Sequence, residues 1–168
     1  PGIFDTKLSF LPFVSNGMIQ TTLCKQLALY VTLYSPLQMA ADVPENYEKH
    51  IDAFQFIKDV AVDWQKSIYL EAEPGDYLTI ARKEKNGERW FVGTITDENK
   101  RTANIDFSFL PKGVSYEATI YADAPDADYQ TNPQAYTITK KRITNKTKLK
   151  IDLARSGGAA ISIVPIKR

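Results

Sequence analysis

The chain has 168 residues, of which 43% are hydrophobic and 24% are charged. This composition is typical of one or two folded domains and excludes wholesale disorder. The 21 basic and 20 acidic side chains leave a formal net charge of +1, which argues against a nucleic-acid-binding surface or a polybasic membrane patch. No apolar run approaches the ~20 residues that a membrane-spanning helix needs, so no membrane span is expected.

Cysteine and histidine are too scarce for several kinds of site. Cys24 is the single cysteine, which excludes an internal disulfide, and its helical position favours a buried apolar role over a nucleophilic one. His50 is the single histidine, so a histidine-based triad or a multi-histidine metal site within this chain is nearly excluded. The sequence opens with Pro1 and Gly2 and lacks an initiator methionine, and we therefore expect it to start inside a longer product.

An irregular lead-in over residues 1–20 is followed by a predicted helix. Apolar residues recur at helical spacing at Leu23, Leu27, Tyr30, Val31 and Tyr34. Thr21 and Thr22 are candidate N-caps. Pro36 disfavours the helical conformation of the residue before it, so the helix is expected to end near Tyr34.

A short strand and a polar loop are predicted next. Residues 37–41 are apolar and uncharged, as in a strand buried on both faces, and the loop 42–47 carries Asp42, Glu45 and Asn46. In α/β barrels and open α/β sheets, the chemistry lies at this end of a strand. These three side chains could bind a sugar hydroxyl or a cation. The alternative is that Asp42 caps the strand end while Glu45 and Asn46 begin a turn after a proline.

A second helix follows, and after it the pattern changes. Asp52 and Gln55 resemble a capping box, ahead of an apolar face that includes Phe54 and Ile57. After about residue 65, short runs alternate between apolar and polar residues, with turn signals between them. The runs are SIYLEAE, DYLTIARK, RWFVGTIT, ANIDFSFL, YEATIYAD, AYTITKKRIT, KLKIDLA and AAISIVPI. They predict a compact antiparallel β domain, a sandwich or a barrel-like pair of sheets.

The turn signals and the size of each part complete the predicted organisation. Asn86-Gly87 is a strong hairpin signal, and Gly157-Gly158 is interpreted as a hairpin turn. The boundary falls near residue 65, which gives an incomplete α/β part over residues 1–65 and a β domain over residues 66–168. An incomplete α/β part should expose apolar surface, and self-association through it is expected.

Two further groups of carboxylates have both a functional and a structural interpretation. Glu71 and Glu73, with Asp76, would share one face of a strand, and a solvated strand face is favoured over a catalytic pair. The loop over residues 122–134 carries carboxylates at the spacing i, i+3, i+5, namely Asp123, Asp126 and Asp128. Such oxygens could bind calcium, but the loop lacks the glycine and the terminal glutamate of an EF-hand, and a surface loop is favoured.

Several aromatic and basic residues also have both a functional and a structural interpretation. Tyr129, Trp64 and Trp90 could stack on sugar rings, but Trp90 lies in the middle of a predicted strand, which favours a place in the core. The basic run over residues 140–142 is interpreted as a solvated strand face rather than a phosphate site. No glycine-rich phosphate-binding loop is present in the sequence.

Three long segments together resemble a known family. They are QLALYVTLYSPLQMAADVPENYEKHIDAFQFIKDVAVDW, YLEAEPGDYLTIARKEKNGERWFVGTITDE and YEATIYADAPDADYQTNPQAYTI. In order, they closely resemble the C-terminal part of family 97 glycoside hydrolases, which are α-glucosidase-like and α-galactosidase-like enzymes of Bacteroides-type bacteria. The resemblance implies that residues 1–65 are the last helix–strand–helix of a (β/α)8 catalytic barrel. Residues 66–168 would be the C-terminal antiparallel β domain.

The resemblance also sets expectations for activity. A full-length enzyme of this family would hydrolyse terminal α-linked glucose or galactose from oligosaccharides with two carboxylates and an assisting calcium ion. It would be periplasmic or bound to the cell envelope. The motifs with the catalytic and calcium-binding glutamates have no match here, so no catalytic, cofactor-binding or metal residue is assigned and this fragment should be inactive. Only the loop with Gln38, Asp42, Glu45 and Asn46 should face the active site, at its rim. The alternative is a non-catalytic carbohydrate-binding or structural β-sandwich module.

Overall fold

The computed structural model describes residues 19–40 and 42–166, so almost all of the predicted lead-in lies outside the described residues. Within this part of the chain, three helices precede the strands: α1 (Leu23–Thr32), α2 (Pro44–Lys49) and α3 (Ile51–Asp59). The strands are β1 (Trp64–Glu73), β2 (Tyr77–Glu84), β3 (Trp90–Thr96), β4 (Arg101–Asp106), β5 (Tyr116–Asp123), β6 (Tyr136–Ile143), β7 (Lys148–Leu153) and β8 (Gly158–Pro165). Each of the eight predicted runs overlaps one of these strands.

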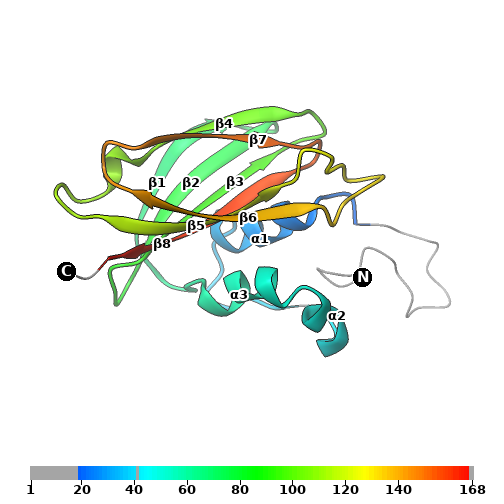
Figure 1. Cartoon of the computed structure of the whole chain (residues 1–168), viewed down its shortest axis with the longest axis horizontal. Helices are drawn as coiled ribbons and strands as arrows, with labels where there is room; N and C mark the ends of the chain where they lie inside the picture. Colours follow the sequence, from blue (N-terminus) through cyan, green and yellow to red (C-terminus); the bar gives the residue numbers. More distant parts are fainter. Residues whose placement is uncertain (1–18, 41, 167–168) are drawn as a thin grey trace.

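The strands form two antiparallel sheets, which confirms the predicted class of the β region. The large sheet has the order β1-β2-β3-β8-β5-β6, and β4 pairs with β7 in a small second sheet. Figure 1 shows three layers, with the β4–β7 sheet over one face of the large sheet and the helices over the other. Asn86-Gly87 lies in the hairpin between β2 and β3, as predicted. Gly157-Gly158 does not form a hairpin, because β7 and β8 belong to different sheets.

The central strands β3 and β8 of the large sheet are buried on both faces, and the sheet separates two hydrophobic cores. Trp90 and Val92 of β3 point into the core between the two sheets, whereas Phe91 points into the core beneath the helices. In the second core, Phe56 of α3 makes edge-to-face contacts with Phe91 and with Tyr121 of β5, at centroid distances of 6.2 and 5.3 Å. The apolar stripe of α1 fills the rest of this core, as its periodicity predicts.

Helix α1 has a defined partner at each end. Thr22 is the N-cap, and its hydroxyl accepts a hydrogen bond from the N–H of Lys25 at 3.2 Å, which confirms one of the two predicted caps. The helix ends at Thr32, two residues before the predicted end. There the Nε of Arg82 donates to the carbonyl of Val31 at 2.7 Å. Arg82 of β2 therefore supplies a donor to the carbonyl end of the helix, whose last turn leaves such acceptors open.

Three local predictions between α1 and β1 are wrong. Residues 37–40 form no strand, and Leu37 and Met39 are 74% and 75% exposed. A central strand needs neighbours on both sides for its N–H and C=O groups, and the described residues offer it none. The expected loop 42–47 is instead largely helix α2, with Pro44 at its first position. Finally, the N-cap of α3 is His50, so Asp52 lies inside the helix and makes no capping box.

Gly93 determines how closely α1 can approach the sheet. A Cβ at this position would lie 2.8 Å from the carbonyl oxygen of Ala28 and 2.9 Å from the Cβ of Val31. We expect Gly93→Val to force the helix off the sheet and to lower the free energy of unfolding by about 1–3 kcal/mol. Urea unfolding followed by circular dichroism measures this change.

Ala72→Val is the matched control, because Ala72 is an exposed strand residue of β1. Its effect should stay within about 0.5 kcal/mol. Equal effects of the two substitutions would show that α1 does not depend on close contact at Gly93.

Candidate functional site

The predicted rim residues lie on the connection from α1 to α2 and on α2 itself. The Oδ1 of Asp42 accepts hydrogen bonds from the N–H of Val43 at 2.8 Å and from the Nδ2 of Asn46 at 2.7 Å. Asp42 therefore anchors the start of α2 and holds Asn46 beside it. Glu45 lies in the first turn of α2, exposed to solvent. Gln38 lies apart from this pair, since its amide donates to the carbonyls of Leu33 and Ser35 at 3.4 and 3.2 Å.

The same connection carries five of the ten large apolar side chains that the described part of the molecule exposes. We define the apolar connector as Leu33, Tyr34, Leu37, Met39 and Val43, each of which is at least 36% exposed. Its backbone is nevertheless held, because the hydroxyl of Tyr30 donates to the carbonyl of Met39 at 3.0 Å. An exposed apolar stretch with fixed backbone contacts indicates a contact surface.

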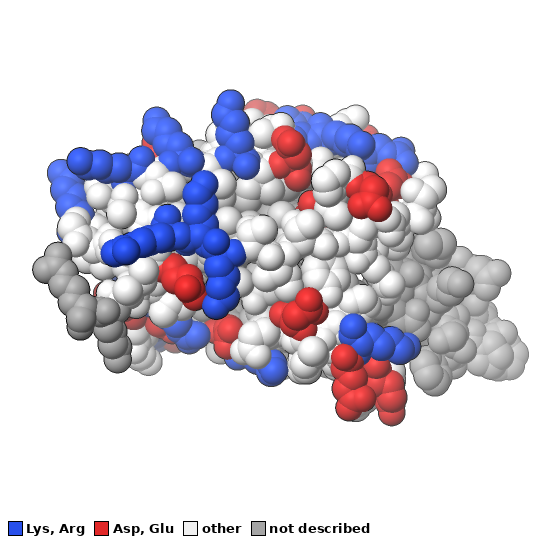
Figure 2. All heavy atoms as spheres, in the orientation of Figure 1, with Lys and Arg blue, Asp and Glu red and all other residues white. Residues whose placement is uncertain are grey.

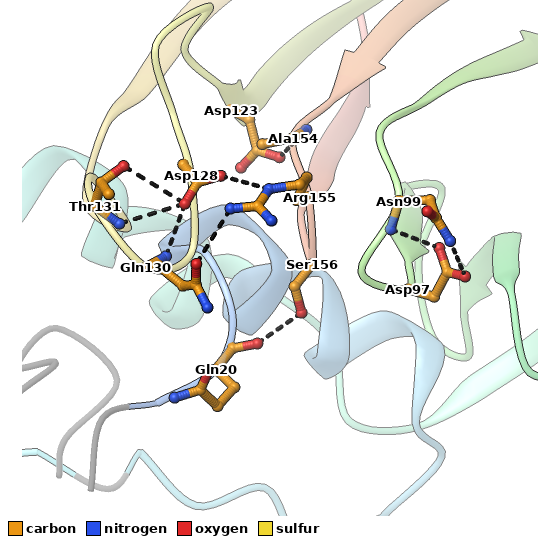
Figure 3. Close-up of polar contacts among 10 residues, drawn as sticks. All are labelled: Gln20, Asp97, Asn99, Asp123, Asp128, Gln130, Thr131, Ala154, Arg155 and Ser156. Atoms are coloured by element: carbon orange, nitrogen blue, oxygen red, sulfur yellow. Dashed lines mark hydrogen bonds and ion pairs between the residues drawn. The ribbon is translucent and has the colours of Figure 1, made fainter.

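At the other end of α1, three segments distant in sequence meet in what we call the polar junction, which comprises Gln20, Thr22, Lys25, Asp123 and Ser156. Figure 3 shows Gln20, Asp123 and Ser156 of this group. The Nζ of Lys25 donates to the carbonyl of Thr96 at 2.7 Å. The hydroxyl of Ser156 donates to the carbonyl of Gln20 at 2.6 Å, and the N–H of Thr22 donates to the carbonyl of Ser156 at 3.1 Å. The junction thus fixes the entry to α1 against the β7–β8 turn.

Asp123, at the end of β5, is the buried charged group of the junction. Its Oδ2 accepts hydrogen bonds from the N–H groups of Ala154 and Gly158 at 3.0 and 2.9 Å. Burial raises the pKa of Asp123 above its usual value, against the opposing effects of the Thr22 hydroxyl, these two N–H groups and Lys25. The carboxylate therefore has a structural role, since it orients the turn that precedes β8.

The aspartates predicted as possible calcium ligands do not converge on one point. Asp123 is engaged by backbone N–H groups, Asp126 accepts a hydrogen bond from the Nδ2 of Asn132 at 2.9 Å, and Asp128 pairs with the Nε of Arg155 at 2.8 Å. The hydrogen bond from Arg155 lowers the pKa of Asp128 to about 2. Among residues 19–40 and 42–166, no group of three or more His, Cys, Asp or Glu side chains could hold a metal ion. The residues of this loop do not fit a calcium site.

The other candidate side chains also have structural partners. Glu71 accepts hydrogen bonds from the N–H and the Nδ2 of Asn104 at 3.0 and 3.3 Å and so links β1 to β4. Trp90 is buried and packs on Phe109, with ring centroids 4.9 Å apart, so its predicted place in the core is confirmed. The guanidinium of Arg155 lies over the ring of Tyr129, 5.1 Å from its centroid. Neither aromatic ring forms an open platform for a sugar.

Two grooves lie in the β region. The first, of about 420 Å³, runs between β5–β6 and β7, and its polar lining includes Thr137, Thr139 and Asp152. The second, of about 390 Å³, lies at the β1–β2 turn beside Lys25. Within the described part of the chain, no helix is both long and apolar enough to cross a membrane.

The ionisation of Asp123 should be visible in the stability of the protein. Because its pKa is raised by folding, its contribution to stability is fully present below the ordinary value of 3.8 and is lost as the pH rises through the raised value. Asp123→Asn keeps an oxygen acceptor but cannot ionise. We expect the unfolding free energy of the native protein to fall relative to that of this variant as the pH rises above the ordinary value of 3.8.

Asp123→Ala is the control, because it removes the acceptor for both N–H groups. It should destabilise the fold by about 1–3 kcal/mol across the whole range of pH. Urea titrations at each pH make the comparison, and a native–Asn difference that is independent of pH would contradict the raised pKa.

Comparison with known proteins gives consistent matches. The family model described as "Glycosyl-hydrolase 97 C-terminal, oligomerisation" matches residues 63–164. The chain is 37% identical over 158 residues to a retaining alpha-galactosidase of Bacteroides thetaiotaomicron, over 94% of this chain and 23% of that protein. It also superposes on a family 97 enzyme from Pseudoalteromonas sp. strain K8 in complex with acarbose, with a TM-score of 0.93 and 48% identity, over 99% of this chain and 26% of that one.

A more distant match shows the extent of the fold. A beta-arabinopyranosidase superposes over 96% of this chain with a TM-score of 0.74 at 20% identity, which shows a shared fold alone. The chain spans about a quarter of the length of the family 97 relatives it matches. The family model covers the β region, and the family 97 relatives cover nearly the whole chain, which confirms the predicted family. The chain belongs to glycoside hydrolase family 97.

Proposed function

We propose that this chain is the C-terminal portion of an α-glycosidase that hydrolyses terminal α-linked glucose or galactose from oligosaccharides. The observation that carries the proposal is the superposition of 99% of the chain, at 48% identity, on a family 97 enzyme that binds acarbose. A retaining alpha-galactosidase among the relatives supports the same substrate class. The two carboxylates of the reaction and an assisting calcium ion would belong to other segments of the longer enzyme.

We further propose that the helical segment is the end of the (β/α)8 catalytic barrel and that the β domain begins near residue 65. The apolar connector supports this proposal, because its exposed side chains lack a covering layer within the described residues. Helix α1 is held at both ends, by Arg82 and by the polar junction, so the β domain fixes where the connector leaves it. Other segments of the barrel would cover the connector in the longer enzyme. In the fragment alone, the same surface would drive self-association.

At the active site, Gln38, Asp42, Glu45 and Asn46 would have a rim role. Their polar oxygens and amide groups suit hydrogen bonds to sugar hydroxyls, and the bond between Asp42 and Asn46 holds two of them ready. We propose a periplasmic or cell-envelope location for the longer enzyme, by resemblance to its family. A β domain that binds sugar by itself has less support, since Trp90 is buried and Tyr129 is covered by Arg155.

The 168-residue chain alone should release no p-nitrophenol from p-nitrophenyl α-glucoside or α-galactoside beyond a control without protein. The physical reason is that a glycosidase needs two carboxylates that flank the scissile bond, and two of the candidate carboxylates, Glu71 and Asp123, are engaged in structural contacts. Turnover that a substitution within this chain abolishes would contradict the proposal.

The rim role can be tested in the longer enzyme with Asp42→Asn. The variant keeps an acceptor for the start of α2 but loses the charge that would bind a hydroxyl. We expect KM for maltose or melibiose to rise about threefold to tenfold while kcat stays within twofold. Glu48→Gln, an exposed position on α2 outside the rim, is the matched control and should leave both constants unchanged. If KM is the same in all three proteins, Asp42 does not contact the substrate.

A further inference from the structure

Charge is distributed unevenly along this nearly neutral chain. Residues 136–153, which form β6, β7 and their turn, contain six basic residues and one acidic residue, a net charge of +5. Residues 42–63, which contain α2 and α3, have six acidic and two basic residues, a net charge of −4. We call the first group the basic ridge, made of Lys140, Lys141, Arg142, Lys146, Lys148 and Lys150. The second group, the acidic helices, contains Asp42, Glu45, Glu48, Asp52, Asp59 and Asp63.

Four of the six residues of the basic ridge make no ion pair within the described residues, and one of these four, Arg142, donates instead to the hydroxyl of Ser115 at 3.3 Å. Lys140 pairs with Glu117 at 3.0 Å and Lys148 pairs with Asp106 at 3.3 Å. Lys141, Lys146 and Lys150 make no ion pair with any carboxylate of residues 19–40 and 42–166, and all three are exposed. The ridge therefore presents net positive charge to solvent.

The acidic helices are similarly uncompensated. Within the same described ranges, Glu45, Glu48 and Asp59 take part in no ion pair. Lys49 of α2 instead donates from its Nζ to the Oδ1 of Asn46 at 3.2 Å. The acidic helices thus carry a net charge opposite in sign and similar in size to that of the basic ridge, and they lie on different elements of the fold.

Both groups are accessible from one side of the molecule. In the orientation shared by Figures 1 and 2, Lys and Arg side chains gather over the half of the face that contains the β6–β7 turn. Acidic side chains gather at the opposite, lower corner, over α2. The face is therefore polarised along its length, from the basic ridge to the acidic helices.

The strand edges beside the ridge are poor sites for self-assembly. Among the described strands, β6 pairs only with β5 and β7 only with β4, so each has an edge without a strand partner in that part of the chain. Pairing either edge with the same edge of another copy would bring the lysines of the two copies together, and charged side chains on edge strands oppose such pairing. If two copies associate at this side, they meet through the face and not by adding strands.

We infer that this polarised face is a contact between two copies of the chain, related by a two-fold axis that lies in the interface. When that axis is perpendicular to the line from the basic ridge to the acidic helices, the rotation sets the ridge of each copy over the acidic helices of the other, so the favourable contact is made twice. The matching family model is described by the word oligomerisation without naming a surface, and the charge pattern assigns one. The inference does not depend on the proposed glycosidase activity.

Sedimentation velocity of the 168-residue chain tests the inference. Leu37→Ser/Met39→Ser serves as the background, because it removes the most exposed apolar side chains of the connector and so suppresses association through that surface. In this background we expect a dimer whose dissociation constant rises on the order of tenfold when NaCl increases from about 50 mM to about 500 mM, because exposed charge pairs are screened. A monomer at low salt, or an association that salt does not weaken, would overturn the inference.

Charge reversal then identifies the surface. Lys146→Glu/Lys150→Glu and Glu48→Lys/Asp59→Lys should each weaken the dimer by tenfold or more, on the order expected for repulsion between like charges. An equimolar mixture of the two variants should restore a dimer, since the reversed ridge of one faces the reversed helices of the other. Lys66→Glu, a charge reversal at an exposed position of β1 outside both groups, should leave the dimer intact.

Three results would count against the polarised face. The first is a mixture that fails to restore the dimer, and the second is a control that weakens it as much as the ridge variant. The third is binding of the ridge to polyglutamate with no self-association, which would assign the surface to an acidic polymer. Urea unfolding of each variant shows that loss of association does not come from loss of folding.

Discussion

The close approach of α1 to the central strands is the constraint on which the rest of the structure depends. Helix α1 crosses β3 and β8 at positions that have no side chain. A Cβ on Gly93 would lie 2.8 Å from the carbonyl of Ala28, and a Cβ on Gly158 would lie 2.8 Å from the Cα of Lys25. Because the helix lies this close, it packs directly on the central strands at one face of the large sheet, and the β4–β7 sheet packs on the other face.

This contact makes the helical segment and the β region one packing unit. The change in sequence pattern near residue 65 marks where helices give way to strands, but the core beneath α1 contains residues from both sides of it, such as Phe56 and Phe91. Polar groups secure the same helix at each end. Arg82 reaches its last carbonyls, and the contacts of Lys25 and Ser156 hold its first turn. The direction in which the connector leaves the fold therefore follows from the β domain.

The sequence was most informative about elements whose apolar and polar residues follow the buried and exposed faces of the element itself. All eight β runs and α1 could be predicted, because period-two and helical periodicities record burial directly. The structure of residues 37–40 could not be predicted, because an apolar run indicates burial by some partner but identifies neither the partner nor the secondary structure. Leu37 and Met39 are apolar but exposed in this chain. Neither the pairing of β4 with β7 nor the turn between two sheets at Gly157-Gly158 leaves a local signal, since both are set by distant partners.

The candidate site was predictable to a similar, limited extent. Asp42, Glu45 and Asn46 were found by their place after an apolar run, and the structure brings Asp42 and Asn46 into contact. Arg82, Lys25 and Ser156 were missed. A lysine within a buried helix and an arginine in a strand otherwise buried on both faces were the available signals, because such groups are seldom buried without a specific acceptor.

The two exposed surfaces differ in chemistry, and the difference argues for two kinds of contact. The apolar connector is a set of large side chains over a fixed backbone, and surfaces of that kind belong to permanent contacts from which water is excluded. The polarised face carries unpaired charges of both signs, which contribute orientation and rate of encounter more than affinity, and which salt weakens. The first suits segments of the same polypeptide, for which effective concentration is high. The second suits a separate copy, for which the relative orientation of the two molecules has to be selected.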